Sequence, residues 1–243
     1  MVKPVSKTSI KYKISNIAFI GNFLFKAFYL FKTEVINRLY IYYNSFHNPF
    51  IKKPMRIYYA HSKKFEFVAD GYFSHLKNIG KVSDGDWDLK KKPFEEFWIY
   101  KGLKERFLLV KNWQETSYFK IVKKSIENGE NPWFCKNLND FNIRLENLDR
   151  MYESIKENGF DTGKGLDHVD TYSYSKLVNK DHGMRAKLDL VSVNVGRNGE
   201  LIVLEGKHRI SMSKILGLSC VPFYVREWHI KSFEKNKNNH LIN

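Results

Sequence analysis

Cysteine is scarce in this sequence, which contains only Cys135 and Cys220 among 243 residues. The two cysteines lie far apart without a metal-ligand spacing, so we expect neither a disulfide framework nor a structural zinc site, and a reducing compartment fits best. Internal repeats and low-complexity tracts are also lacking, which argues against solenoids and disordered linkers. The sequence has no Gly-x-x-x-x-Gly-Lys-Ser/Thr loop, Gly-x-Ser-x-Gly elbow or His-Glu-x-x-His helix. We therefore expect a globular, cytoplasmic protein that uses some other motif.

Acidic residues are outnumbered, with 26 aspartates and glutamates against 41 lysines and arginines, which gives a formal net charge of +15. Such an excess predicts a polyanionic partner, which could be a nucleotide, a nucleic acid or an anionic membrane surface. The alternative is compositional bias, because the chain is also rich in Asn, Ile, Phe and Tyr. Charge alone does not choose between these.

A long uninterrupted hydrophobic run is absent as well. The most apolar segment, Asn16 to Phe31, is broken by Asn22 and Lys26 and is shorter than the roughly 20 residues that a membrane-spanning helix needs. No small-residue cleavage site follows it. We expect residues 1–54 to form a basic, aromatic helical extension that either packs on the body or makes peripheral contact with a membrane surface.

Residues 55–165 are predicted to be mainly helical, with one short strand near residues 55–60. The clearest helix has apolar residues at steps of four, three, four and three, with Asn139 or Asp140 available as its N-cap and Gly159 as its stop. Two further helices are indicated around residues 94–98 and 118–126. These apolar positions are assigned to the core.

Residues 166–243 change period. Alternating residues at 191–195, the turn Asn198-Gly199 and the run "ELIVLE" predict a β-hairpin. A helix over 207–216, stopped by Gly217, and a strand over 221–225 follow. The predicted fold class is therefore α+β, with a helical amino-terminal half and a carboxy-terminal domain in which helices pack on a small mixed sheet.

The stretch "LEGKHRIS" places Lys207, His208 and Arg209 on the first turn of that helix. Cations are unfavourable there unless an anion joins them, because a helix N-terminus is already partly positive. Gly206 would let the backbone approach a phosphate, the first-turn amides would bind its oxygens, and Arg209 could form a bidentate pair. His208 is either a phosphate ligand or a core histidine. Glu205 could bind a ribose hydroxyl, hold Arg209 or cap the strand.

Residues 189–226, with Gly206-Lys207-His208-Arg209 at the strand-to-helix loop and Pro222 in the last strand, resemble the core of the ParB/sulfiredoxin superfamily. The resemblance implies that this loop binds nucleotide phosphates. Partition-type members add a helix-turn-helix, for which the seventeen residues after Arg226 are too few. Sulfiredoxins carry a reactive Cys where this chain has Lys207. The branch that resembles free serine kinase, which transfers a nucleotide phosphate to a hydroxyl, conflicts least.

The segment "SDGDWDL" contains three alternating carboxylates. Asp86 and Asp88 are candidate Mg²⁺ ligands, and Asp84 or Glu205 is a candidate base. The alternative is an acidic turn with Trp87 in the core. Together with "ERF" at 105–107, Trp113 and Thr116, this segment resembles a group of uncharacterised proteins that carry the same carboxy-terminal domain. That likeness implies one site assembled from both halves, with Arg106 as a further phosphate contact.

The sequence therefore predicts a protein that binds a nucleoside triphosphate, ATP or CTP, with Mg²⁺. It would either hydrolyse the nucleotide or transfer phosphate to a small hydroxylated acceptor. The first alternative is a basic nucleic-acid-binding protein, either DNA-binding or a nuclease that uses Asp167-His168 and Asp181-His182 with a metal. The second is a membrane-associated binding protein anchored by its amino-terminal helix.

Overall fold

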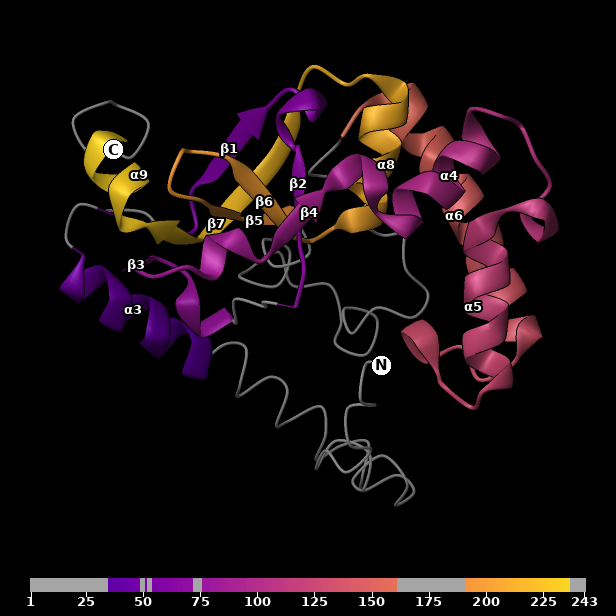
Figure 1. The fold of residues 1–243 in the computed structure, drawn as a ribbon, viewed down its shortest axis with the longest axis horizontal. Coiled ribbons are helices and arrows are strands. Elements are labelled where there is room, and N and C mark those ends of the chain that lie inside the picture. Colours follow the sequence, from indigo (N-terminus) through magenta and orange to yellow (C-terminus); the bar gives the residue numbers. More distant parts are fainter. Residues whose placement is uncertain (1–34, 49–50, 52–53, 72–75, 161–190, 237–243) are drawn as a thin grey trace.

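The computed structural model describes residues 35–48, 51, 54–71, 76–160 and 191–236. These residues form a mixed α/β fold in which one seven-stranded sheet is flanked by helices (Figure 1). The expected combination of helices with a mixed sheet is confirmed at this level. The apolar segment at residues 16–31 and the two Asp-His pairs lie outside the described residues.

The sheet contains parallel and antiparallel strands. Its order is β1 (Ile57–Ala60), β7 (Val221–His229), β5 (Val191–Val195), β6 (Leu201–Glu205), β2 (Phe67–Ala69) and β4 (Lys91–Pro93), and β3 (Lys81–Ser83) pairs with the end of β7. β5 and β6 form the predicted antiparallel hairpin, and Gly199 in its turn has φ of 86°. β5 runs parallel to β7, and β6 runs parallel to β2.

The sheet extends across the boundary expected near residue 165. β1, β2, β3 and β4 all come from residues 57–93, and they pair with β6 and β7 from the end of the chain. The region expected to be mainly helical therefore contributes strands to the same sheet. β2, β3 and β4 have three residues each, which is too short for a period-two pattern to be visible, so only tertiary pairing defines them.

β7 is longer than the predicted strand at 221–225, because it continues through two charged residues to His229. Arg226 and Glu227 are both buried, and each is paired: Arg226 with the Glu205 carboxylate, and Glu227 with Asn78 Nδ2 at 2.7 Å and Ser83 Oγ at 2.6 Å. Two adjacent charged residues can therefore be buried in a central strand, because partners from distant segments of the chain pair with each of them.

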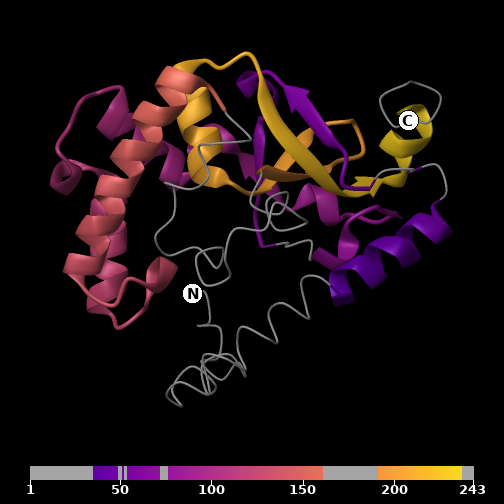
Figure 2. The ribbon, with the colours of Figure 1, turned by 180° about the vertical axis from the view of Figure 1, so that it is seen from behind.

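The longer helices lie in two groups at the two ends of the sheet, as Figures 1 and 2 show from opposite sides. One group comprises α4 (Trp98–Phe107), α5 (Ser117–Glu127), α6 (Leu138–Asn158) and α8 (Lys207–Leu216), and the other comprises α3 (Asn37–His47) and α9 (Ile230–Asn236). α8 packs against α4 and α6, and α4 packs against α5. The core of this group is apolar and includes the fully buried Phe94, Leu103, Phe141, Leu148 and Ile210.

The helix boundaries follow local capping signals. α8 begins and ends at the predicted residues, with Gly217 in the left-handed region at φ of 66° as its C-cap. α6 ends at Gly159 as predicted, but its N-cap is Asn137 instead of Asn139 or Asp140. The Asn137 side chain accepts a hydrogen bond from the Asp140 amide at 2.9 Å, so the helix begins one residue after Asn137, at Leu138.

Candidate functional site

The junction between β6 and α8 requires glycine. Gly206 has φ of 77° and ψ of 21°, in the left-handed region, and it is the N-cap residue of α8. A β-carbon at this position would lie 2.9 Å from Val191 Cγ2 and 3.0 Å from Val191 Cα. The first intrahelical bond runs from the Ile210 amide to the Gly206 carbonyl at 3.0 Å. The amides of residues 207–209 therefore belong to the helix N-terminus, where no intrahelical acceptor exists.

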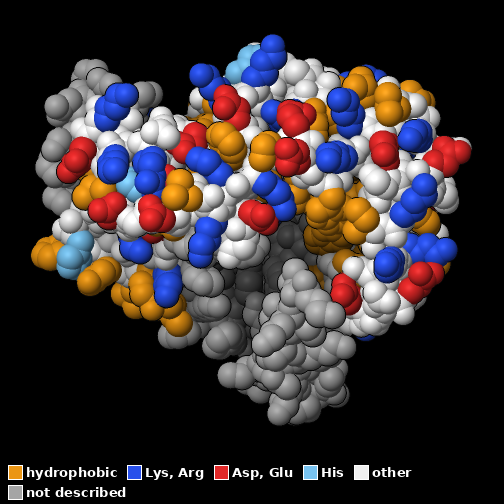
Figure 3. Space-filling model, viewed as in Figure 1, with side chains coloured by type: hydrophobic (Ala, Val, Ile, Leu, Met, Phe, Trp, Pro, Cys, Tyr) orange, Lys and Arg blue, Asp and Glu red, His pale blue; other side chains and the backbone are white. Residues whose placement is uncertain are grey.

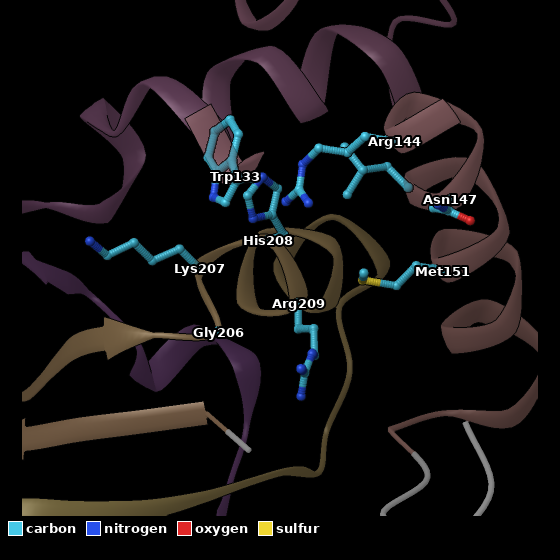
Figure 4. A pocket seen from close by; sticks show the side chains of 9 residues that line it. Trp133, Arg144, Asn147, Met151, Gly206, Lys207, His208 and Arg209 are labelled. Carbon is cyan, nitrogen blue, oxygen red and sulfur yellow. The ribbon is translucent and has the colours of Figure 1, made fainter. Parts of the chain in front are cut away.

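A cavity of about 150 Å³ lies between the start of α8, the middle of α6 and the short helix η7 (Pro132–Phe134) (Figure 4). Its described lining is Trp133, Arg144, Asn147, Leu148, Met151, Gly206, Lys207, His208 and Arg209. The four predicted loop residues are thus all present. This described lining includes three cationic side chains and no carboxylate, so the cavity has the electrostatic character of an anion site.

The three cationic side chains, one from α6 and two from α8 itself, point in different directions around the start of α8 (Figure 4). Figure 4 shows the Arg144 guanidinium pointing from α6 toward His208, whereas Lys207 and Arg209 leave α8 in other directions. Arg144 is 7% exposed, and its guanidinium carbon lies 4.6 Å from the centre of the Trp133 ring. Lys207 Nζ lies 5.3 Å from the centre of the Phe97 ring. Arg144 is therefore the cation that is most firmly fixed by packing.

Arg144, Trp133 and Asn147 were not among the residues predicted for this site. One signal was available for Arg144. It lies on the apolar stripe of the amphipathic α6, three residues after Phe141 and four before Leu148, both of which are buried. A cation on the buried face of a helix needs a compensating group, so its position in the stripe could have identified it.

Two aromatic side chains, Tyr118 and Trp133, pack against His208. Its Nε2 lies 3.1 Å from the Tyr118 hydroxyl, and its ring packs edge-on against Tyr118 and Trp133. Tyr118 reaches this position because Gly102 of α4 lets α5 approach closely: a β-carbon on Gly102 would lie 2.3 Å from Tyr118 Cβ. His208 is desolvated like a core histidine and also lines the cavity. Its role as a phosphate ligand stays a prediction.

Desolvation, followed by the charges of Arg144, Arg209 and Lys207, lowers the pKa of His208 well below its usual range. The imidazole is therefore neutral at pH 7. A neutral imidazole donates one hydrogen bond and accepts one. The tautomer determines whether Nε2 donates to the Tyr118 hydroxyl or accepts a hydrogen bond from it. His208 can thus contact an anion with its remaining nitrogen only as a single N–H donor.

This depressed pKa predicts a pH dependence of stability. Between the folded pKa and the unfolded value of about 6.5, the unfolded chain binds a proton that the folded chain does not. The contribution is fully present above about pH 6.5 and is lost as the pH falls toward the folded pKa, with a slope of up to about 1.4 kcal/mol per pH unit. We expect denaturant unfolding between pH 8 and pH 5 to show a steeper loss for the wild type than for His208→Gln. Equal pH slopes for the two proteins would contradict the assignment.

Glu205, a candidate base, lies at the end of β6 beside the cavity and is exposed. Its carboxylate forms an ion pair with the buried Arg226, whose guanidinium also lies 3.3 Å from the Tyr224 hydroxyl. Of the roles considered for Glu205, holding a cation is observed, but with Arg226 of β7 as the described partner. The carboxylate stays accessible, since its side chain is 56% exposed.

The acidic turn around Trp87 is tied to the opposite end of the β5–β6 hairpin. Asp88 is fully buried and accepts hydrogen bonds from Arg197 Nε at 2.9 Å, from Arg197 Nη2 at 2.7 Å and from the Arg197 amide at 2.9 Å. Asp86 accepts from the same Nη2 at 2.7 Å. Arg197 precedes the five-residue β6 and Gly206 follows it, and such a strand spans roughly 17 Å. The structure therefore does not bring the acidic turn to the Gly206 loop.

The geometry of this turn corresponds to the structural alternative. Trp87 packs against the cluster of Ala69, Ile202 and Leu204. Asp84 is 77% exposed and lies 3.7 Å from His229 Nε2. Across the part of the chain that the structure describes, no group of three His, Cys, Asp or Glu side chains is placed to hold a metal ion. The roles of Asp84, Asp86 and Asp88 in metal binding and catalysis stay predictions.

Arg106 connects α4 to α6 instead of reaching the cavity. It donates from Nε and Nη2 to the two carboxylate oxygens of Asp149 at 3.1 and 3.0 Å and from Nη1 to the Lys111 carbonyl at 3.1 Å. Trp113 Nε1 donates to the same Asp149 at 3.0 Å. Thr116 caps α5 by accepting from the Phe119 amide at 3.1 Å. Arg106, Trp113 and Thr116, which suggested a composite site, therefore connect or cap the helices α4, α5 and α6.

A second, larger cavity of about 690 Å³ lies between β1, the β5–β6 turn and α9. Its floor is apolar and includes Phe223, Val225 and Trp228, and its described edge carries Arg56 and Lys235. Arg197 also borders this cavity, but its guanidinium is bound by Asp86 and Asp88.

Both cysteines have free thiols; Cys135 is buried and Cys220 is exposed. Comparison of the chain with protein-family models, with curated proteins and with solved structures finds no match in any of the three.

Proposed function

We propose that the protein binds the phosphate groups of a nucleoside triphosphate at the start of α8. The observation that carries this proposal is the composition of the cavity at the N-terminus of α8, a helix of ten residues. Arg144, Lys207 and Arg209 line this cavity, and the described lining holds no carboxylate. Helix N-termini bind anions through their amides and their partial positive charge, and added cations strengthen that binding.

Each group has a distinct part in this binding. The amides of residues 207–209 and the buried Arg144 fork supply directed hydrogen bonds to phosphate oxygens, whereas Lys207 supplies a point charge. Neutral His208 avoids adding a fourth cation. Cavities that enclose whole drug-sized ligands measure about 300–1,000 Å³, so a cavity of about 150 Å³ suits phosphates, with the nucleoside extending onto the surface.

β5, β6, α8 and β7 follow one another in the order predicted from the sequence. The resemblance of this part of the sequence to the ParB/sulfiredoxin superfamily implies the same phosphate site. For hydrolysis or for transfer to a small hydroxylated acceptor, we place the base at Glu205, the exposed carboxylate directly before Gly206. Because no carboxylate occurs in the described lining, Mg²⁺ would be held by the nucleotide phosphates and water.

Calorimetric titration with MgATP, MgCTP, inorganic triphosphate and adenosine tests the proposal. We expect the three triphosphates to bind with similar affinities and adenosine not to bind, because the phosphates supply the recognition. Adenosine binding as tightly as MgATP, or no binding of any triphosphate, would show that the site has another ligand.

A nucleic-acid-binding function is the second candidate, and the larger cavity favours it. The guanidinium carbon of Arg56 lies 5.5 Å from the centre of the Tyr58 ring. Trp228, Lys235 and the exposed Tyr59 also line this larger cavity, which forms a groove. Single strands bind such grooves by stacking bases on aromatic rings and pairing phosphates with cations. A single-stranded oligonucleotide included in the titrations distinguishes the two: tighter binding than inorganic triphosphate, with steep weakening by salt, favours the groove.

A further inference from the structure

Asn44 and Ile41 on the inner face of α3 contact the body of the protein. Asn44 is 7% exposed and donates from Nδ2 to the Lys77 carbonyl at 2.8 Å and to the Ile79 carbonyl at 2.9 Å. Ile41 packs against the cluster of Ile79 and Tyr224. These contacts fix the rotation of the helix, and therefore fix which of its side chains face outward.

The outward face of α3 is apolar and aromatic. Its large hydrophobic residues and their exposed fractions are Leu39 63%, Tyr40 43%, Tyr42 74%, Tyr43 59% and Phe46 76%. Residues 39, 42, 43 and 46 follow the spacing of a single helical face. Figure 3 shows hydrophobic side chains gathered over this part of the molecule, at its lower left edge. Exposed apolar patches of this kind mark interaction surfaces, since isolated soluble domains rarely keep them.

The charge of the chain is concentrated in the same region of the sequence. Residues 1–65 contain twelve lysines and arginines and a single acidic residue, Glu34, which gives a net charge of +11. The remaining 178 residues contain 29 basic and 25 acidic residues, a net charge of only +4. Compositional bias across the whole chain would not produce this asymmetry. An aromatic surface within a strongly basic segment is complementary to an apolar layer covered by negative charge.

We infer that α3 is a membrane-surface helix that lies in the headgroup region of an anionic bilayer, with Leu39, Tyr42 and Phe46 turned toward the lipid. Tyrosine is favoured at this depth because its ring is apolar and its hydroxyl is polar, and cations near the surface add attraction to anionic lipid. An eleven-residue helix is about 16 Å long, roughly half of the hydrocarbon thickness. Among the described residues, no helix is long and apolar enough to cross a membrane.

The inference is independent of the phosphate site, because α3 and α8 belong to the groups of helices at opposite ends of the sheet (Figures 1 and 2). Changes on the outer face of α3 should leave nucleotide binding unaltered. An experiment can therefore contradict membrane binding by α3 without contradicting phosphate binding at α8, and the reverse.

Co-sedimentation with phosphatidylcholine vesicles, with and without phosphatidylglycerol, tests the inference on the full chain. Tyr42→Ser/Phe46→Ser removes apolar area from the α3 face, where both side chains are largely exposed and contribute little to folding. Leu108→Ser/Leu109→Ser is the matched control, because these side chains are 54% and 58% exposed beyond α4. We expect the wild type and the control to bind anionic vesicles, with binding weakened by salt, and the α3 variant to bind on the order of tenfold more weakly.

Three results would overturn the inference. The wild type could fail to sediment with anionic vesicles, or the α3 variant could bind as tightly as the wild type, which would place any membrane contact elsewhere in the basic segment. Alternatively, sedimentation equilibrium could show a homodimer that the α3 variant abolishes, which would make the patch an interface between two copies of the chain.

Discussion

Replacement of Arg144 by methionine is expected to weaken the binding of MgATP and of inorganic triphosphate by roughly 10- to 150-fold. Hydrogen bonds that involve a charged group contribute about 1.5–3 kcal/mol, and that range converts to the stated factor. Methionine preserves much of the apolar stem that packs beside Trp133, so the change removes mainly the guanidinium. Isothermal titration of the wild type and the variant gives the ratio directly.

Lys156→Met is the control for this experiment. Lys156 lies on the same helix, is 56% exposed and forms a surface ion pair with Glu153 at 3.4 Å. The control removes the same unit of charge, so it corrects for the general attraction between a basic protein and a polyanion. Equal affinities for Arg144→Met and Lys156→Met would mean that the cavity is not where phosphate binds.

Replacement of Asp88 by asparagine is expected to lower the free energy of unfolding by about 2–3 kcal/mol, because a fully buried carboxylate loses charged hydrogen bonds with Arg197. Burial raises the pKa of Asp88, but the hydrogen bonds from Arg197 outweigh this effect and hold the pKa below its ordinary value. The stabilisation is therefore present above the ordinary carboxyl pKa of about 3.9 and is lost as the pH falls through the folded pKa. Denaturant unfolding at neutral pH measures the loss.

Asp86→Asn is the matched control for Asp88. Both carboxylates bind Arg197 Nη2, but Asp86 is 79% exposed, and exposed ion pairs contribute little. We expect no resolvable change in stability for Asp86→Asn and no change in triphosphate binding for either variant. A loss of triphosphate binding in Asp88→Asn, without a loss of folding, would restore the acidic turn to the functional site.

Local signals predicted much of the carboxy-terminal quarter of the fold. The Asn198-Gly199 turn with flanking alternation located the hairpin, and Gly206 and Gly217 marked both ends of α8. Each of these features depends on residues within a few positions of one another, so they can be identified from sequence. The strands β2, β3 and β4 depend on pairing with β6 and β7 far along the chain, and their own three residues carry no such signal.

The candidate site was predictable only on the side that α8 contributes. The sequence indicated Gly206, Lys207, His208 and Arg209, and the structure places all four in the cavity lining. The acidic turn was a plausible partner by composition, but its true partner, Arg197, lies 109 residues further along the chain. Arg144 lies on a helix of which only the apolar positions were assigned, to the core. Which charged residues meet is decided by tertiary packing, and that information is not local.

The phosphate site at the start of α8 is tested most directly by adding inorganic triphosphate to the isotope-labelled protein and following backbone amide chemical shifts. We expect the largest shifts at the amides of residues 206–209, with smaller shifts at Arg144 and Asn147. Shifts confined to Arg56, Lys235 and the neighbouring groove, with the amides after Gly206 unchanged, would contradict the assignment.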